Sequence, residues 1–172
     1  MEENININYR WCKSSDKHLL NELAELFVIN AANYYISHGE VIDGRADNMN
    51  EWKTDIKTIL HREFSNAINN TFDMPDTFTR LVVAQRNATL IGLALVEFHP
   101  DTRVAILCDI VVDTPLRGYK IGESLLHWIE VEVKQWGAKF LFLESGNENH
   151  AAHHFFKKAG FNGVSIVMMK EL

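Results

Sequence analysis

The chain has 172 residues, a length typical of one compact domain. Apolar residues make up 47% and charged residues 23%, which excludes a disordered, collagen-like or coiled-coil protein. The formal net charge is −6, so there is no surplus of Lys and Arg to neutralise phosphates. We therefore expect a single domain over residues 1–172 that does not bind nucleic acid.

The sequence also indicates the compartment. Apolar runs such as 90–96 are far shorter than the roughly 20 residues that a membrane-spanning helix needs. The first residues, MEENININYRW, lack the basic and apolar regions of a secretory signal. The two cysteines, Cys12 and Cys108, lie far apart, which suits a reducing compartment. We expect a cytoplasmic protein without a membrane partner.

In the first part of the chain, helical spacing of apolar residues follows a short strand. Residues 5–12 predict that strand, and a helix is expected over 16–35 with its first residue, an aspartate, as the N-cap. The polar stretch 37–50 contains two glycines and predicts a loop. Apolar residues then recur every four residues from Trp52, which predicts a second helix over 50–69.

Farther along the chain, the spacing of apolar residues becomes typical of β-strands. A Pro- and Gly-containing turn and further glycines then separate alternating helices and strands. The expected elements are a hairpin of strands 79–85 and 89–98, a strand at 103–112, a helix at 121–136, a strand at 140–143, a helix at 149–159 and a last strand at 161–169. The order β-α-α-β-β-β-α-β-α-β predicts an α+β fold with a mixed, mostly antiparallel central sheet flanked by helices.

The strongest chemical signal is the segment 112–123, VDTPLRGYKIGE, where a strand gives way to a helix through a glycine-containing turn. The first N–H groups of such a helix have no intrahelical partner and can bind a pyrophosphate, assisted by the helix dipole. Arg117 and Lys120 can add positive charge, and Gly122 permits close approach of the phosphate. Taken alone, the pattern fits a plain β-turn-α connection equally well.

Three segments together resemble the GNAT acetyltransferase superfamily. Residues 117–122 fill its phosphate motif [Q/R]-x-x-G-x-[G/A], and 107–112 is similar to its strand motif L-x-D-[apolar]-x-V. Residues 149–161, NHAAHHFFKKAGF, match N-x-x-A-x-x-F-Y-x-K-x-G-F. Two positions depart from the family pattern: Lys120 replaces a glycine, and Phe156 replaces the tyrosine that many members use as general acid.

The resemblance implies an enzyme that transfers an acetyl group from acetyl-CoA to an amine by direct attack in a ternary complex. It implies that the strands 103–112 and 140–143 splay apart and that pantetheine lies in the gap. Asp109 and Glu144 are the candidate catalytic residues. The candidate cofactor-binding residues are Ile110, Val111, Val112, Arg117, Gly118, Tyr119, Lys120, Ile121, Gly122, Glu123, Asn149, Phe155 and Phe156.

The acceptor is less well defined. In this fold the segment 33–50 is expected to select it, and three acids against one arginine there favour a small, cationic amine. A protein lysine or N-terminal acceptor, and a CoA-binding regulatory module with little catalysis, remain alternatives. His150, His153 and His154 share one helix without an acidic or Cys partner at matching spacing, so we expect no metal. The oligomeric state is left open, a homodimer included.

Overall fold

The computed structural model describes residues 6–69 and 77–172. They form two compact units, which are described separately. The sheet unit contains the described residues up to Ala31 and residues Asp55–Leu143, and the small unit contains Ala32–Thr54 and Glu144–Leu172.

A five-stranded sheet organises the sheet unit, with the strand order β1-β4-β5-β6-β7. The first four strands pair antiparallel, whereas β7 pairs parallel to β6. The crossover between β6 and β7 contains a helix, as a parallel connection requires. The strands are β1 (Asn8–Trp11), β4 (Phe78–Arg86), β5 (Thr89–His99), β6 (Val104–Val112) and β7 (Phe140–Leu143).

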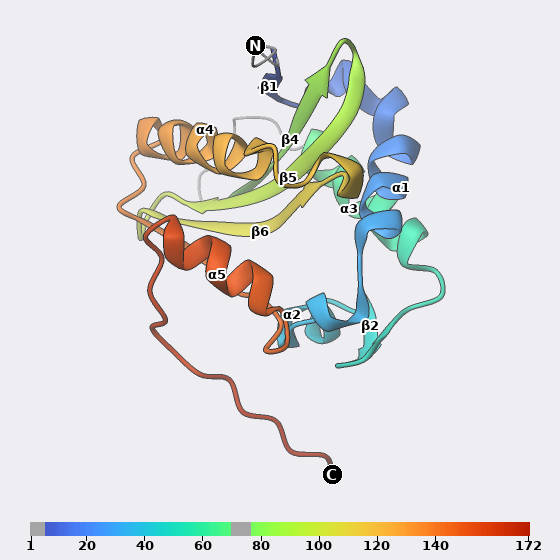
Figure 1. The fold of residues 1–172 in the computed structure, drawn as a ribbon, viewed down its shortest axis with the longest axis vertical. Coiled ribbons are helices and arrows are strands. Elements are labelled where there is room, and N and C mark those ends of the chain that lie inside the picture. Colours follow the sequence, from blue (N-terminus) through green and yellow to red (C-terminus); the bar gives the residue numbers. More distant parts are fainter. Residues whose placement is uncertain (1–5, 70–76) are drawn as a thin grey trace. The chain divides into compact units, whose positions relative to one another are not determined.

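Helices cover both faces of this sheet (Figure 1). On one side α1 packs on α3, and both contact the central strands, while α4 contacts β6. Between the layers lie fully buried side chains such as Leu23, Phe64 and Leu125. The helical elements are η1 (Ser14–Leu19), α1 (Leu20–Asn30), α3 (Ile56–Asn69), η3 (Thr114–Leu116) and α4 (Ile121–Gln135). The predicted fold class, a mostly antiparallel mixed sheet flanked by helices, is confirmed.

Aromatic packing fixes α4 against the first strand. The Trp11 ring lies 5.2 Å from that of Trp128 and 4.7 Å from that of Trp136, measured between centroids. The Trp11 indole N–H donates a hydrogen bond of 2.7 Å to a carboxylate oxygen of Glu132. Such contacts contribute about 0.5–1.5 kcal/mol per ring pair beyond burial, so the middle and the C-terminal end of α4 are held against β1.

The small unit joins two segments that are distant in the sequence. Its elements are η2 (Asn33–Tyr35), α2 (His38–Ile42), β2 (Ala46–Asn48), β3 (Glu51–Trp52) and α5 (His150–Lys158). The strands β2 and β3 form an antiparallel pair. Phe156 on α5 is buried and packs edge-on against Phe155 and Phe161.

The predicted helix over 16–35 is divided into shorter elements, and Asp16 is not its N-cap. The 3-10 turn η1 begins one residue after Lys13, and the Asp16 carboxylate accepts hydrogen bonds from the Lys13 N–H and the Arg10 guanidinium, each 2.7 Å long. Burial alone would raise the pKa of Asp16, but these hydrogen bonds outweigh it and lower that pKa. The aspartate therefore anchors the turn onto β1, although its residue type suggested a cap.

The prediction of a loop over 37–50 and a helix over 50–69 is also wrong in part. The first segment contains α2 and β2, and Trp52 lies in β3 opposite Ala46. The Trp52 indole N–H donates to the carbonyl of Ala32 at 3.3 Å. The helix begins only at Ile56, so the spacing of four from Trp52 to Ile56 does not reflect one continuous helix.

The last predicted strand, 161–169, is not present. These residues form no strand ladder in the structure, and Val164, Ile166 and Met168 are exposed. A strand requires a partner edge for its N–H and C=O groups, which side-chain composition cannot supply. The first residue of the strand predicted over 5–12, Ile5, lies outside the described residues, and Asn8–Trp11 of that strand is confirmed as β1.

Both cysteines are free thiols, Cys12 buried and Cys108 exposed. Burial, with a contribution from Asp16, raises the pKa of Cys12 to about 12. Cys12 is therefore protonated at neutral pH and serves as a small apolar residue. Within residues 6–69 and 77–172, no helix is both long enough and apolar enough to cross a bilayer.

Candidate active site

The edge of β6 opens within the sheet unit. Strand β7 pairs with β6 from Val104 to Leu107, and the ladder stops there because β7 ends at Leu143. Strand β6 continues to Val112, with its other edge still bonded to β5. The β6–β7 ladder thus ends at Leu107, five residues before the end of β6, as expected for two strands that splay apart.

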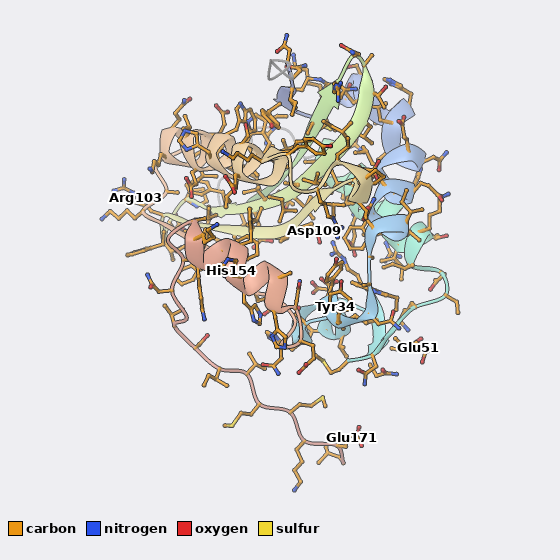
Figure 2. The ribbon with its side chains drawn as sticks, viewed as in Figure 1. Tyr34, Glu51, Arg103, Asp109, His154 and Glu171 are labelled. Atoms are coloured by element: carbon orange, nitrogen blue, oxygen red, sulfur yellow. The ribbon has the colours of Figure 1, made fainter. Side chains whose placement is uncertain are left out.

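A β-bulge marks the point where this edge opens. Across β5, Leu95 pairs with Asp109 and Val96 pairs with Leu107, so Cys108 is the extra residue. A bulge changes the direction of the following side chains and is common beside active sites. Asp109, labelled in Figure 2, comes directly after it. This residue is only 7% exposed. The candidate cofactor-binding residues Ile110, Val111 and Val112 follow and are partly buried.

The turn after β6 leads into a helix start with no side-chain cap. Lys120 occupies the N-cap position of α4, and its side chain makes no capping hydrogen bond with the first turn. The first intrahelical hydrogen bond runs from the Ser124 N–H to the Lys120 carbonyl at 3.0 Å. The N–H groups of Ile121, Gly122 and Glu123 precede it and are oriented toward the helix N-terminus. This geometry suits a pyrophosphate.

Lys120 has a left-handed backbone conformation, with φ 60° and ψ 14°. Glycine adopts it freely, whereas a residue with a β-carbon pays roughly 1–2 kcal/mol. Lys120, at the position where the resemblance expects a glycine, thus adopts a conformation that favours glycine and carries an ammonium group at the N-cap position. Gly118, with φ 87°, provides the other left-handed residue of the turn.

Arg117 does not extend freely from the turn. Its Nε–H donates to the Val112 carbonyl at 3.2 Å, and Nη2 donates to the Asn30 carbonyl at 3.4 Å. The guanidinium thus ties the turn to the end of β6 and to the end of α1. The contribution of Arg117 to the charge of an anion site stays a prediction, and the structure shows that its side chain holds the turn.

Asn30 is a residue of the site that the sequence motifs did not indicate. It ends α1, is 7% exposed, and its Oδ1 accepts hydrogen bonds from the Thr114 N–H at 2.8 Å and the Thr114 hydroxyl at 2.7 Å. Its amide donates to the Leu26 carbonyl and to Asp113. One side chain therefore fixes the start of the phosphate turn. The only sequence signal was a polar residue at the end of an amphipathic helix.

The remaining candidates lie in the small unit. Glu144 accepts hydrogen bonds from the Ser37 hydroxyl and from the Gly39 N–H, and pairs with His38. Asn149 caps α5, with its side-chain oxygen accepting from the Ala152 N–H at 3.3 Å. Because Phe156 is buried and carries no hydroxyl, it supplies packing at the place of the family's tyrosine.

Most acidic side chains of the segment 33–50 form ion pairs, which its composition alone did not indicate. Glu40 pairs with the buried Arg45 at 3.3 Å, and Asp47 pairs with Lys53 at 2.7 Å. Two of its three acidic side chains are thus matched by cations within the same unit. Tyr34, labelled in Figure 2, is half exposed. Its ring packs edge-on against that of Tyr35, with the ring centroids 4.5 Å apart. The segment therefore carries an exposed aromatic ring beside acids that are mostly paired.

Comparisons with known proteins agree with this geometry. The model of the acetyltransferase (GNAT) family matches residues 46–161. An aminoalkylphosphonate N-acetyltransferase of Salmonella typhimurium is 32% identical over 102 residues, which is 57% of this chain and 65% of that protein. The chain thus matches slightly less than two thirds of that relative's length.

Solved structures share the fold. The PaiA N-acetyltransferase from Thermoplasma acidophilum, in complex with coenzyme A, superimposes with a TM-score of 0.68 at 20% identity, over 91% of this chain and 90% of that one. The aminoglycoside N-acetyltransferase AAC(6')-Iy, in complex with CoA, gives a TM-score of 0.63 at 13% identity, over 100% of this chain and 98% of that one. At these identities the likeness establishes the arrangement of elements.

Replacing Gly122 by Val is expected to weaken acetyl-CoA binding at least tenfold, about 1.4 kcal/mol, because the side chain obstructs the helix start. Valine has a higher helix propensity than glycine, so the helix itself should persist. Isothermal titration measures the dissociation constant. His127→Val, at an exposed position of the same helix, is the matched control and should bind normally. An unchanged dissociation constant in folded Gly122→Val protein would contradict the assignment of the turn.

Asn30→Ala is expected to lower the free energy of unfolding by about 1–3 kcal/mol, because it leaves the Thr114 N–H without its partner. The loosened turn should also raise the acetyl-CoA dissociation constant several-fold. Urea denaturation and titration measure the two effects. Asn69→Ala, at the exposed end of α3, should change neither. If Asn30→Ala loses stability but binds acetyl-CoA normally, Asn30 supports only the fold.

Proposed function

Because the chain belongs to the GNAT acetyltransferase family, we propose that it transfers the acetyl group of acetyl-CoA to a primary amine of a small molecule, by direct attack in a ternary complex. This proposal rests on two neighbouring features of the sheet unit, the edge of β6 beyond its ladder with β7 and the N-terminus of α4. The open main-chain edge of β6 leads through one turn to the uncapped start of α4. Acetyl-CoA has a pantetheine arm that can bond to a strand edge and a pyrophosphate that can bind at a helix N-terminus.

Each feature fits one part of the cofactor. Residues 110–112 carry N–H and C=O groups that can bond the pantetheine amides as a further strand would, and an N–H near Val112 can polarise the thioester carbonyl. The N–H groups of 121–123 and the Lys120 ammonium suit the pyrophosphate. Each hydrogen bond to a charged oxygen contributes about 1.5–3 kcal/mol, so three or four outweigh the ordering of the turn.

The acceptor must arrive without its proton. A primary amine with a pKa of about 10.4 is mostly protonated at pH 7, and removing that proton costs about 4–5 kcal/mol. A group that holds the ammonium and a group that accepts its proton therefore raise the rate. Asp109, buried beside the bulge of β6, is proposed to hold the ammonium by its charge.

Relatives support a small acceptor. The Salmonella relative is named for aminoalkylphosphonates, and one solved neighbour is named for aminoglycosides. The paired acids of segment 33–50 mean that a strongly cationic acceptor has less support than the composition indicated. The proposal therefore specifies a small primary amine without fixing its net charge.

The test is a thiol-release assay with acetyl-CoA over a panel of amines. The panel contains aminoalkylphosphonates, aminoglycosides, polyamines and peptides with a free lysine or N-terminus. Turnover of a small amine with release of CoA supports the proposal. Turnover of peptides alone would make the protein a peptide acetyltransferase. Tight acetyl-CoA binding without turnover of any amine would make it a CoA-binding regulatory module.

Asp109→Asn keeps the shape of the side chain and removes its charge. We expect kcat/KM for the acceptor to fall about 10- to 100-fold, which is about 1.4–2.7 kcal/mol of transition-state stabilisation. Acetyl-CoA affinity should stay the same. Asp101→Asn, in the exposed turn before β6, is the matched control. If Asp109→Asn protein unfolds more easily while its folded fraction keeps full activity, Asp109 is structural.

A further inference from the structure

The hydrogen-bond pattern at the end of β6 determines which of its main-chain groups point away from β5. In an antiparallel pair of strands, residues that exchange hydrogen bonds alternate with residues whose N–H and C=O groups point away from the partner strand. The Asp113 N–H donates to the Ile91 carbonyl at 3.0 Å, and the next pair along the strands is Val112 with Gly92. Val112 therefore belongs to a pair without mutual hydrogen bonds, and its main-chain groups point away from β5.

The same alternation gives the orientation of Ile110. The pairing of residues 109–112 with β5 is continuous, so Ile110 has the orientation of Val112, whereas Val111 lies in a hydrogen-bonded pair. The ladder between β6 and β7 ends earlier, at Leu107. Beyond that ladder, the outer edge of β6 therefore carries the N–H and C=O groups of Ile110 and Val112.

Arg117 occupies one of these edge groups. Its Nε–H donates to the Val112 carbonyl at 3.2 Å, and its Nη2 donates to the Asn30 carbonyl at 3.4 Å. A guanidinium has its donors in a fixed planar fork and has no acceptor, so two bonds to different elements set its orientation. A ligand amide that lies along the edge must compete with Arg117 for the Val112 carbonyl, but not for the Val112 N–H or for the groups of Ile110.

We infer that Arg117 is a positioning residue that sets the register of acetyl-CoA along β6. This inference rests on the proposed function, in which the pantetheine arm bonds to the edge of β6. Because the guanidinium holds the Val112 carbonyl, the arm has the Val112 N–H and the groups of Ile110 as its partners. An arm that shifted toward the phosphate turn would need the Val112 carbonyl as an acceptor. Val112 thus marks the point where the arm leaves β6 and turns toward the start of α4.

The inference assigns the role of Arg117 to a donor at a set position, and its charge is not required for it. The amide nitrogen of a glutamine is as many bonds from Cα as the Nε of an arginine, so Arg117→Gln keeps a donor for the Val112 carbonyl without the charge. Arg117→Met has a side chain of similar length without any donor. The side chain of residue 117 is exposed, so both variants are expected to fold.

The test compares acetyl-CoA with the acetyl thioester of a CoA homologue that has one additional methylene group in its pantetheine arm. With the acceptor amine found in the panel, we expect wild-type kcat/KM to favour acetyl-CoA by about tenfold or more, because the longer arm cannot keep both its partners on β6 and the pyrophosphate position. In Arg117→Met the Val112 carbonyl can accept from a shifted arm, and the preference should fall several-fold. Arg117→Gln should keep the wild-type preference. Arg62→Met, at an exposed arginine of α3, is the matched control and should also keep it.

The ratio of the two kcat/KM values separates this role from a merely structural one. An equal loss with both thioesters in Arg117→Met would overturn the inference, because Arg117 would then support only the shape of the turn. A fall of the preference in Arg117→Gln as large as in Arg117→Met would overturn it as well, since the charge and not the donor would then matter. A wild-type protein that acetylates no amine would contradict the proposed transfer itself, and the dissociation constants of the two thioesters would then decide on the register in the same way.

Discussion

The early end of the parallel ladder between β6 and β7 is the constraint on which the site depends. A strand edge that is not paired must satisfy its N–H and C=O groups in another way. In this protein the edge of β6 beyond the β7 ladder, 110–112, follows a bulge and leads directly to a helix start whose N-cap side chain makes no hydrogen bond. Had β7 been longer, its own backbone would have occupied the groups that the cofactor is proposed to use.

Side chains from other elements hold that opening in place. Asn30 secures the start of the turn from the end of α1, and Arg117 ties the turn to the Val112 carbonyl. The aromatic contacts of Trp11 with α4 hold the helix against the other end of the sheet order. Preorganisation of this kind matters because a phosphate site made of main-chain N–H groups works only when their directions are fixed.

In the small unit, side-chain and close main-chain contacts also hold separate segments together. Its two segments, distant in the sequence, meet through the Glu144 carboxylate and through the close approach of Gly146 to the carbonyls of Tyr34 and Ile36. A glycine and an acid thereby define the position of a histidine. Neither residue belongs to a motif, and their roles follow from contacts that only the folded chain makes.

The sequence by itself determined the fold class, the hairpin of β4 and β5, the strand 140–143 and the helix start after the phosphate turn, because each depends on local periodicity or turn chemistry. It also indicated the family through residues 107–122 and 149–161, later matched by the family model over 46–161. Only the tertiary structure decided that Trp52 lies in a strand and that 161–169 forms no ladder. It also decided that Asn30 holds Thr114 and that Ser37 and His38 contact Glu144. The physical reason is the same in each case. Strand partners and side-chain hydrogen bonds join residues far apart in the chain, and the spacing of residues along a sequence carries no record of them.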